Sequence, residues 1–206
     1  ELVKGDEIFL VSKSQRKKKE ILIDNLSHVK GLKPGGKISL DNGQIDLKIL
    51  SLSKQHIKCL VLDNGKISEK KHVNFPGAKI KLPTLTDKDK LDLNEALKTG
   101  VDFIALSFCR SAKDLKQLKG FIRKSKSIPE IFAKVEDQEG VKNIREITKN
   151  SDGLMIARGD LGIETDMTNL PYVQRNMVKI ASELGKKSIV ATQLLESMIK
   201  KPHPTR

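Results

Sequence analysis

After residue 86 the chain alternates four times between a helical pattern and a short apolar run, and this alternation restricts the fold more than any other feature. The expected helices begin behind the capping residues Thr86 and Ser111, near Val141, and at Pro171. The expected strands cover residues 101–108, 131–136, 153–157 and 188–192. Such a pattern predicts an α/β fold with a parallel sheet and right-handed crossovers. Four units are half of a (β/α)8 TIM barrel or a small open sheet, and periodicity does not choose between them.

The chain before this alternation carries strand and turn patterns without a helical pattern. Asn-Gly pairs within residues 41–43 and 63–65 favour hairpin turns, because glycine and asparagine adopt the positive φ that tight hairpins need. Alternating apolar residues flank both turns. We therefore expect a small all-β domain, a barrel or a sandwich, over residues 1–76 and the α/β part over residues 77–206.

The net charge of +13 raises the question of a polyanionic partner. The densest basic run, residues 13–19, is expected to be a solvated hairpin tip, and a basic polyanion-binding module remains an alternative function. The chain has no Trp and one Tyr, so it lacks the aromatic platform on which single-stranded nucleic acid stacks. We therefore expect no nucleic acid partner, and we note that a basic balance also suits an enzyme of phosphorylated substrates.

The two cysteines, Cys59 and Cys109, match neither a metal nor a redox spacing. Reduced, buried thiols in a cytoplasmic protein are the expectation. We find no run long and apolar enough to cross a membrane, and no signal peptide, so no membrane partner is expected. The chain starts with Glu1 and stops after Arg206 without a closing element, which favours a fragment.

Polar residues replace apolar ones at the carboxyl end of each predicted strand, at residues 107–110, 134–137, 158–160 and 192–193. Ligands bind at this end of parallel sheets. Lys134 and Glu136 are two residues apart and point to the same face of their strand. Glu136 and Asp160 could together hold a hard cation, Mg²⁺ or Mn²⁺. Lys134 would then neutralise a transferred or developing anion.

Each of these residues also has an ordinary structural explanation. Lys134 and Glu136 could form a structural ion pair, Asp160 could cap the next helix, and Thr192 could be a plain strand residue. The convergence of all four at strand ends favours a functional site. The histidines are interpreted as surface or packing residues: His28, His56, His72 and His203.

Four motifs closely resemble the pyruvate kinase family: residues 74–77, 132–140, 152–162 and 191–198. The resemblance covers nearly the whole chain in collinear order. It implies strands four to seven of a (β/α)8 barrel, with residues 1–76 as the lid-like β domain. The implied reaction is phosphoryl transfer from phosphoenolpyruvate to ADP, giving ATP and, after protonation of the enolate, pyruvate. The family needs Mg²⁺ and usually K⁺, and its intact enzymes are expected to be homotetramers.

The resemblance also implies a role for individual residues. Lys134 matches the lysine that stabilises the phosphoryl group in flight. Glu136 and Asp160 match the divalent metal ligands, and Thr192 matches the threonine implicated in proton delivery. Lys71 matches the β-domain lysine that approaches the nucleotide phosphates. The backbone that holds the substrate carboxylate at the start of a short helix is matched by Ala157, Arg158, Gly159 and Asp160.

This sequence departs from the family pattern at three positions. His72 stands where the family usually has Gly, Phe75 where it has Leu, and Lys187 where Pro is frequent. The first two lie at the end of the β domain and weaken the nucleotide role of Lys71. The family's K⁺ ligands and its phosphate-binding arginine belong to strands that are not in this chain. We therefore expect the 206-residue chain to be inactive by itself.

Two further hypotheses for the function stay open in addition to a pyruvate kinase. A citrate-lyase-like carbon–carbon lyase also uses a glutamate and an aspartate at the strand ends of the same barrel, with Mg²⁺. The inserted β domain and the Thr192-Gln193 motif argue against it. A degenerate, non-catalytic relative is disfavoured, because every site residue that this chain could carry is present.

Overall fold

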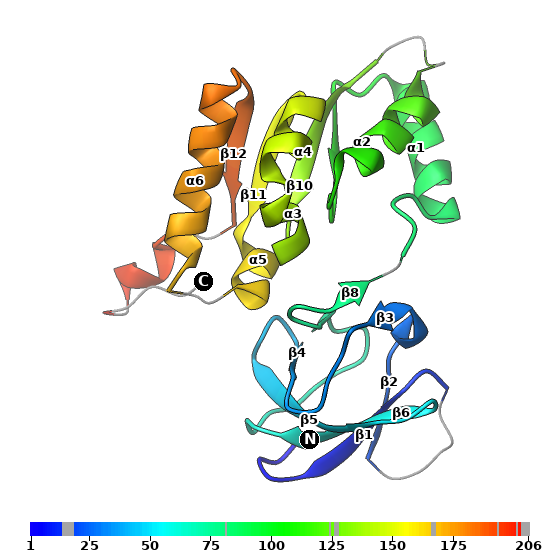
Figure 1. Ribbon diagram of the computed structural model, residues 1–206, viewed down its shortest axis with the longest axis vertical. Coiled ribbons are helices and arrows are strands. Elements are labelled where there is room, and N and C mark those ends of the chain that lie inside the picture. The colour runs from blue at the N-terminus through cyan, green and yellow to red at the C-terminus, as the bar shows by residue number, and fades with distance from the viewer. Residues whose placement is uncertain are drawn as a thin grey trace. The chain divides into compact units, whose positions relative to one another are not determined.

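The computed structural model describes residues 1–13, 19–80, 82–123, 125, 128–165, 168–192, 194–200 and 202. The chain divides into two compact units, Glu1–Leu82 and Pro83–Arg206 (Figure 1). The sequence placed this division at residues 76 and 77. In the structure, β8 (Lys79–Ile80) pairs with β3 (Val29–Lys30), so the first unit extends beyond residue 76 to Leu82. Gln193, His203 and most of the basic run, residues 14–18, lie outside the described residues.

The first unit is built on a six-stranded sheet with the order β2-β1-β6-β5-β4-β7. Its strands are β1 (Glu7–Val11), β2 (Glu20–Leu22), β4 (Lys37–Leu40), β5 (Ile45–Leu52), β6 (His56–Val61) and β7 (Val73–Asn74), and a short 3₁₀ helix, η1, covers Leu26–His28. Alternate residues of β5 and β6 are buried, as expected for strands with one face on a core. The predicted strand-rich character of this part is confirmed.

One of the two predicted hairpins is confirmed and the other is wrong. Asp41, Asn42 and Gly43 have φ values of 48°, 55° and 76°, and they connect the antiparallel strands β4 and β5. Gly65 instead forms an isolated bridge with Leu2, because the amino-terminal segment takes the place that a returning strand would occupy. The strands that flank the basic run, β1 and β2, pair in parallel.

The second unit contains a four-stranded parallel sheet with the order β12-β11-β10-β9, as the alternation predicted. The strands are β9 (Phe103–Leu106), β10 (Glu130–Val135), β11 (Gly153–Ala157) and β12 (Lys187–Ala191). The helices are α1 (Asp87–Thr99), α2 (Ala112–Ile122), α3 (Gln138–Lys142), α4 (Ile144–Asn150), α5 (Arg158–Glu164), α6 (Leu170–Glu183) and the 3₁₀ helix η2 (Glu196–Ile199). This is an α/β fold.

Local chemistry sets most of the helix boundaries. Thr86 and Ser111 begin α1 and α2 with capping boxes, and Gly100 ends α1 with a φ of 76°. The single helix expected near Val141 is two short helices that meet at Asn143. After β11 the helix α5 begins directly at Arg158, where the resemblance implied the start of a short helix. Glycines in this stretch therefore lie inside a helix.

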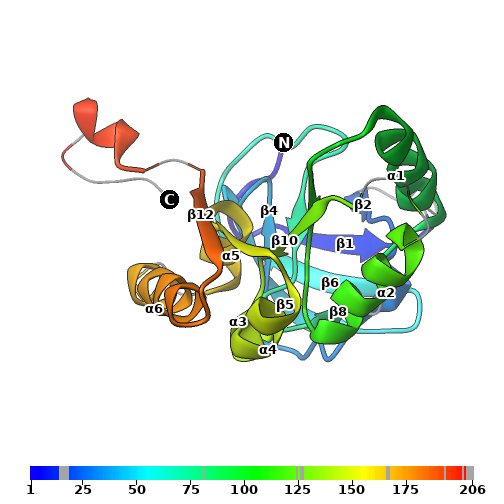
Figure 2. The same cartoon turned by 90° about the horizontal axis from the view of Figure 1, so that it is seen from above.

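The two faces of the parallel sheet differ. Helices α4 and α6 lie along one side of strands β10, β11 and β12 (Figure 2). Ile131, Ala133 and Val135 point to that side and join the apolar core that the helices complete. The opposite face carries an entirely apolar hollow of about 400 Å³ lined in part by Phe103, Phe132, Met155 and Ile189. Phe103 and Ile189 remain 58% and 41% exposed.

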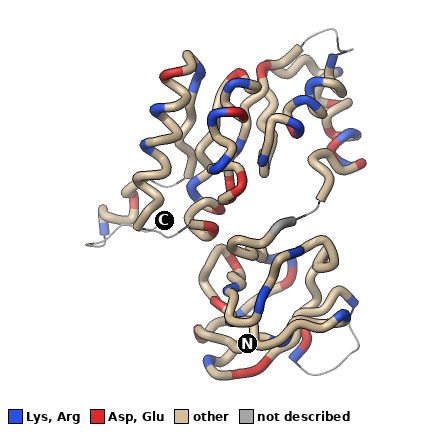
Figure 3. Tube along the Cα trace, viewed as in Figure 1, with Lys and Arg blue, Asp and Glu red and all other residues tan. Residues whose placement is uncertain are grey.

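Charged side chains occur throughout both units. Lys and Arg are interspersed with Asp and Glu along the trace (Figure 3). Many form surface ion pairs, such as Lys58 with Glu7 and Lys187 with Glu130. No helix in the described part of the chain combines the length and the apolar character needed to cross a membrane.

Candidate active site

The predicted site residues of the α/β unit share one edge of the parallel sheet. Val135 of β10 is paired with Ile156 of β11, and Ala157 is paired with Ala191 of β12. Glu136, Arg158 and Thr192 each follow directly after the carboxyl end of a strand. The strand register therefore places these polar residues at about the same level, where ligands bind in parallel α/β folds.

Glu136 is the best-defined carboxylate at this edge. Its side chain is only 4% exposed, and its Oε1 lies 3.1 Å from Lys134 Nζ. Its Oε2 accepts a hydrogen bond of 2.6 Å from the backbone N–H of Phe108. Lys134 also donates to Ser107 Oγ at 2.9 Å. The ion pair that was the structural alternative for these two residues thus exists, and its partly exposed lysine has two neighbours, Glu136 and Ser107.

The backbone donor to Glu136 comes from an unusual conformation. Phe108 has a φ of 48°, which few residues other than Gly, Asn or Asp adopt. The Arg110 guanidinium lies 5.6 Å from the centroid of the Phe108 ring and pairs with Asp137 at 2.6 Å. Asp137 also accepts from the N–H of Gly140 and so begins α3. These contacts fasten the loop after β9 to the end of β10.

Gly140 allows this loop and α3 to come together. A Cβ at this position would lie 2.9 Å from the carbonyl oxygen of Cys109 and 3.0 Å from a methyl of Val135. Neither group can withdraw easily, because one is backbone and the other is buried. The sequence pattern indicated a strand end at residues 107–110 but predicted no role for Ser107 or for the Phe108 N–H. The only available signal was the change from apolar to polar residues.

The ends of β11 and β12 also meet. A Cβ built at Gly159 would lie 3.5 Å from Cγ2 of Thr192, so the threonine methyl rests against the first turn of α5. Thr192 has a φ of 77°, which is a genuine outlier for a β-branched residue. Strained backbone of this kind is concentrated at functional sites, because the surrounding structure must hold it in place. Thr192 is thus not an ordinary strand residue.

Asp160 lies in the first turn of α5, one residue after Gly159. The N-cap position of this helix is Ala157. The alternative explanation, in which Asp160 caps α5, is therefore wrong. An acidic residue in the first turn is favoured by the partial positive charge of a helix amino terminus. The side chain of Gln138, from α3, donates to the backbone oxygen of Glu164 at the other end of α5 and holds that helix beside β10.

Lys71, the predicted nucleotide contact, belongs to the first unit. Its Nζ lies 3.0 Å from Oδ1 of Asp41, in the confirmed hairpin turn. Asp41 is 8% exposed, and its backbone N–H donates to the carbonyl of His72. The turn between β4 and β5 thereby fixes the direction of the lysine. Lys71 is itself 39% exposed along its side chain and stays accessible from solvent.

The donor set suits a hard cation better than a soft one. The predicted ligands Glu136 and Asp160 offer carboxylate oxygens, which Mg²⁺ and Mn²⁺ prefer, and such ions usually complete their shell with water and substrate oxygens. Among the described residues, no group of three or more His, Cys, Asp or Glu side chains could hold a metal. Burial raises the pKa of Cys59 and Cys109 to about 12, so neither is a ready thiolate ligand.

The parallel sheet and its helices define an α/β protein in which polar residues gather at the strand ends. The family model "Pyruvate kinase, barrel domain" matches residues 1–206. Pyruvate kinases of Staphylococcus aureus strains MRSA252 and USA300 are each 38% identical to the chain over 212 aligned residues. The alignments cover 100% of this chain and 36% of each relative. The chain therefore belongs to the pyruvate kinase family, whose members are phosphotransferases.

Proposed function

We propose that the carboxyl edge of the parallel sheet is the phosphoryl-transfer side of a pyruvate kinase active site. In the proposed reaction the phosphoryl group of phosphoenolpyruvate moves to ADP, the bond between phosphorus and the enol oxygen breaks, and a proton is added to the resulting enolate. The observation that supports this most directly is the pair formed by Lys134 and Glu136 after β10, with the Phe108 N–H on the second carboxylate oxygen.

Lys134 is the proposed stabiliser of the transferred group. Phosphoryl transfer depends on positioning and on neutralising the charge of the phosphoryl oxygens. Ser107 and Glu136 hold the lysine ammonium from two sides, so little side-chain reorganisation is needed during the reaction. Glu136 and Asp160 are the proposed ligands of Mg²⁺ or Mn²⁺, which would supply further positive charge. K⁺ is proposed as a second cofactor of the intact enzyme, with ligands outside this chain.

The start of α5 is the proposed seat of the substrate carboxylate. Helix amino termini bind anions through backbone N–H groups and the partial positive charge of the helix, and the proposed segment is Ala157, Arg158, Gly159 and Asp160. A Cβ built at Gly159 would lie 3.5 Å from Thr192 Cγ2, and this proximity supports a role for Thr192 beside the same substrate. We assign to Thr192 the role in proton delivery to the enolate. Lys71 is the proposed contact to the phosphates of ADP or ATP.

The apolar hollow supports a barrel for the α/β unit. In a (β/α)8 barrel the helices cover the outer face of the strands, and apolar side chains fill the interior. In the described part of the chain, helices cover one face of the sheet, and Phe103, Phe132 and Ile189 line a hollow on the other. We propose that the four strands are part of such a barrel and that residues 1–76 form the accompanying lid domain. The intact enzyme is proposed to be a cytoplasmic homotetramer.

A chimeric enzyme tests the proposed function. The chain replaces the matching segment of a Staphylococcus aureus pyruvate kinase, and ADP-dependent formation of pyruvate from phosphoenolpyruvate is measured. We expect activity in the chimera, a loss of several orders of magnitude with Lys134→Met, and no activity in the 206-residue chain alone. A folded chimera without turnover would refute the assignment, as would a Lys134→Met variant with unchanged turnover. Lys179→Met, at an exposed lysine of α6, is the matched control.

A further inference from the structure

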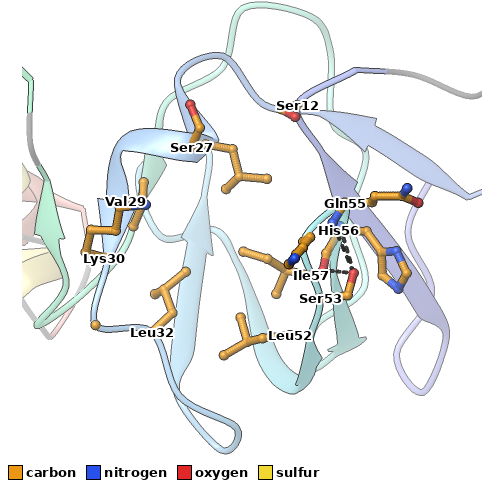
Figure 4. A pocket seen from close by; sticks show the side chains of 13 residues that line it. Ser12, Ser27, Val29, Lys30, Leu32, Leu52, Ser53, Gln55, His56 and Ile57 are labelled. Carbon is orange, nitrogen blue, oxygen red and sulfur yellow. Dashed lines mark hydrogen bonds between the residues drawn. The ribbon is translucent and has the colours of Figure 1, made fainter.

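A cavity of about 430 Å³ opens in the first unit (Figure 4). It lies between the segment around η1 and β3, residues 26–32, and the connection between β5 and β6, residues 52–57. Ser12, at the end of β1, completes the lining. The volume falls within the range of small-molecule sites, about 300–1,000 Å³. None of the residues assigned above to phosphoryl transfer or nucleotide binding lines it.

Apolar side chains form the inner part of this cavity. Figure 4 shows Leu32, Leu52 and Ile57 gathered between the two segments. Ile57 is buried within the core of the unit, whereas Leu52 keeps 40% of its surface exposed. An exposed leucine at the side of a concave apolar surface can be covered by a ligand with an apolar body.

The remaining lining is polar, includes two lysines and lacks a carboxylate. Two lysines, Lys30 and Lys54, line the cavity, and its thirteen lining residues include no Asp or Glu. Within the described part of the chain, neither lysine forms an ion pair, in contrast to Lys58, which binds Glu7 at 2.8 Å. The His56 ring packs edge-to-face on Phe9. The charge at this cavity therefore comes from the two lysines.

The wall that carries Lys54 is a built turn. Ser53 Oγ accepts from the backbone N–H groups of Gln55 and His56, at 3.3 Å and 3.1 Å, and donates to the carbonyl of His56. Ser53 N–H also donates to the same carbonyl at 2.9 Å. The turn between β5 and β6 is thus held by its own hydrogen bonds, so a ligand would not have to order it.

We propose that this cavity binds a small organic acid that has an apolar body and one anionic head. The apolar side chains would cover the body, and Lys30 and Lys54 would attract the head. A polyphosphate fits less well, because it has no apolar body to cover Leu32, Leu52 and Ile57. A stacked nucleobase fits less well too, because no Phe, Tyr or Trp lines the cavity.

Three probes separate the contribution of the apolar body from that of the anionic head. They are hexanoate, the neutral hexanamide of nearly equal size, and inorganic phosphate, which is charged but has no apolar body. Each is titrated at constant ionic strength into the isotope-labelled 206-residue chain, and backbone amide shifts are followed by NMR. We expect hexanoate to shift the amides of Leu32, Ser53 and Ile57 in a saturable way. Hexanamide should bind several-fold more weakly because it lacks the charge. Phosphate should bind more weakly still because it lacks the apolar body.

Two variants test each half of the proposal. Lys54→Gln should weaken hexanoate binding about two- to fivefold, the effect of one solvent-exposed ion pair, and leave hexanamide binding unchanged. Leu52→Gln should weaken the binding of both. Lys66→Gln removes an exposed lysine of the same unit away from the cavity and should change neither. Equal binding of hexanoate and hexanamide, equal effects of Lys54→Gln and Lys66→Gln, or the absence of saturable shifts at the cavity would each overturn the proposal.

Discussion

Replacing Glu136 by Gln removes one charge from a side chain that two donors approach from different sides. Lys134 Nζ lies against Oε1 and the Phe108 N–H points to Oε2. A glutamine has one oxygen and one NH₂ group in these two places, so one donor must face another donor. The substitution keeps the size of the side chain, and a loss of stability therefore measures the polar contacts.

The exposure of the pair sets the expected magnitude. Breaking a fully buried ion pair costs about 3–5 kcal/mol. Glu136 is 4% exposed but Lys134 is 26% exposed, and water can partly solvate the lysine that is left behind. We therefore expect Glu136→Gln to lower the free energy of unfolding by about 2 kcal/mol, which is less than the cost of breaking a fully buried pair. Urea denaturation of the 206-residue chain, followed by circular dichroism, measures this.

A double-mutant cycle and a matched control decide the cause. The combination of Glu136→Gln with Lys134→Met should cost less than the sum of the two single changes, with a coupling of about 1 kcal/mol. Glu130→Gln, at the other end of the same strand, breaks an ion pair with Lys187 whose side chains are 43% and 60% exposed. It should cost less than about 1 kcal/mol. Additive effects in the cycle, or equal costs at Glu130 and Glu136, would refute the reasoning.

The remaining predictions concern glycines, thiols and acid stability. Gly140→Ala should destabilise the chain by about 1–3 kcal/mol, because its Cβ would meet the carbonyl of Cys109. Gly120→Ala, in α2 with open space around it, should instead stabilise the chain by about 0.5–1 kcal/mol. The midpoints of denaturant unfolding compare the two variants. Because burial raises the pKa of Cys59 and Cys109 to about 12, both thiols should resist alkylation at pH 8 until urea unfolds the chain, and rapid alkylation of the native chain would contradict this. Hydrogen bonds from the Thr86 hydroxyl and, second, from the Thr86 backbone N–H lower the pKa of Asp89 from 3.8. The contribution of Asp89 to stability is therefore present above pH 3.8 and is lost as pH falls through the lowered pKa. Asp89→Asn should flatten this acid dependence, as measured by helicity at pH 2–5, and an unchanged profile would rule the carboxyl out as its source.

Short-range patterns predicted the elements whose cause is local. The capping box that begins α1 at Thr86, the glycine that ends it at Gly100, and the turn that begins at Asp41 all follow from residues close together in the sequence. The second predicted hairpin failed because Gly65 pairs with Leu2, more than sixty residues away, and no local signal records that partner.

The sequence by itself determined the parallel sheet, the strand ends where polar residues gather, and the shared face of Lys134 and Glu136, because helix and strand periods are properties of consecutive residues. Only the tertiary structure decided which groups meet there. Phe108 adopts a positive φ, and its N–H reaches Glu136, which lies 28 residues later in the sequence. Thr192, at the end of another strand, also adopts a positive φ and brings its methyl toward Gly159. Such backbone conformations are unfavourable locally. They persist because the packing around them supplies the contacts, which the chain makes only after it has folded.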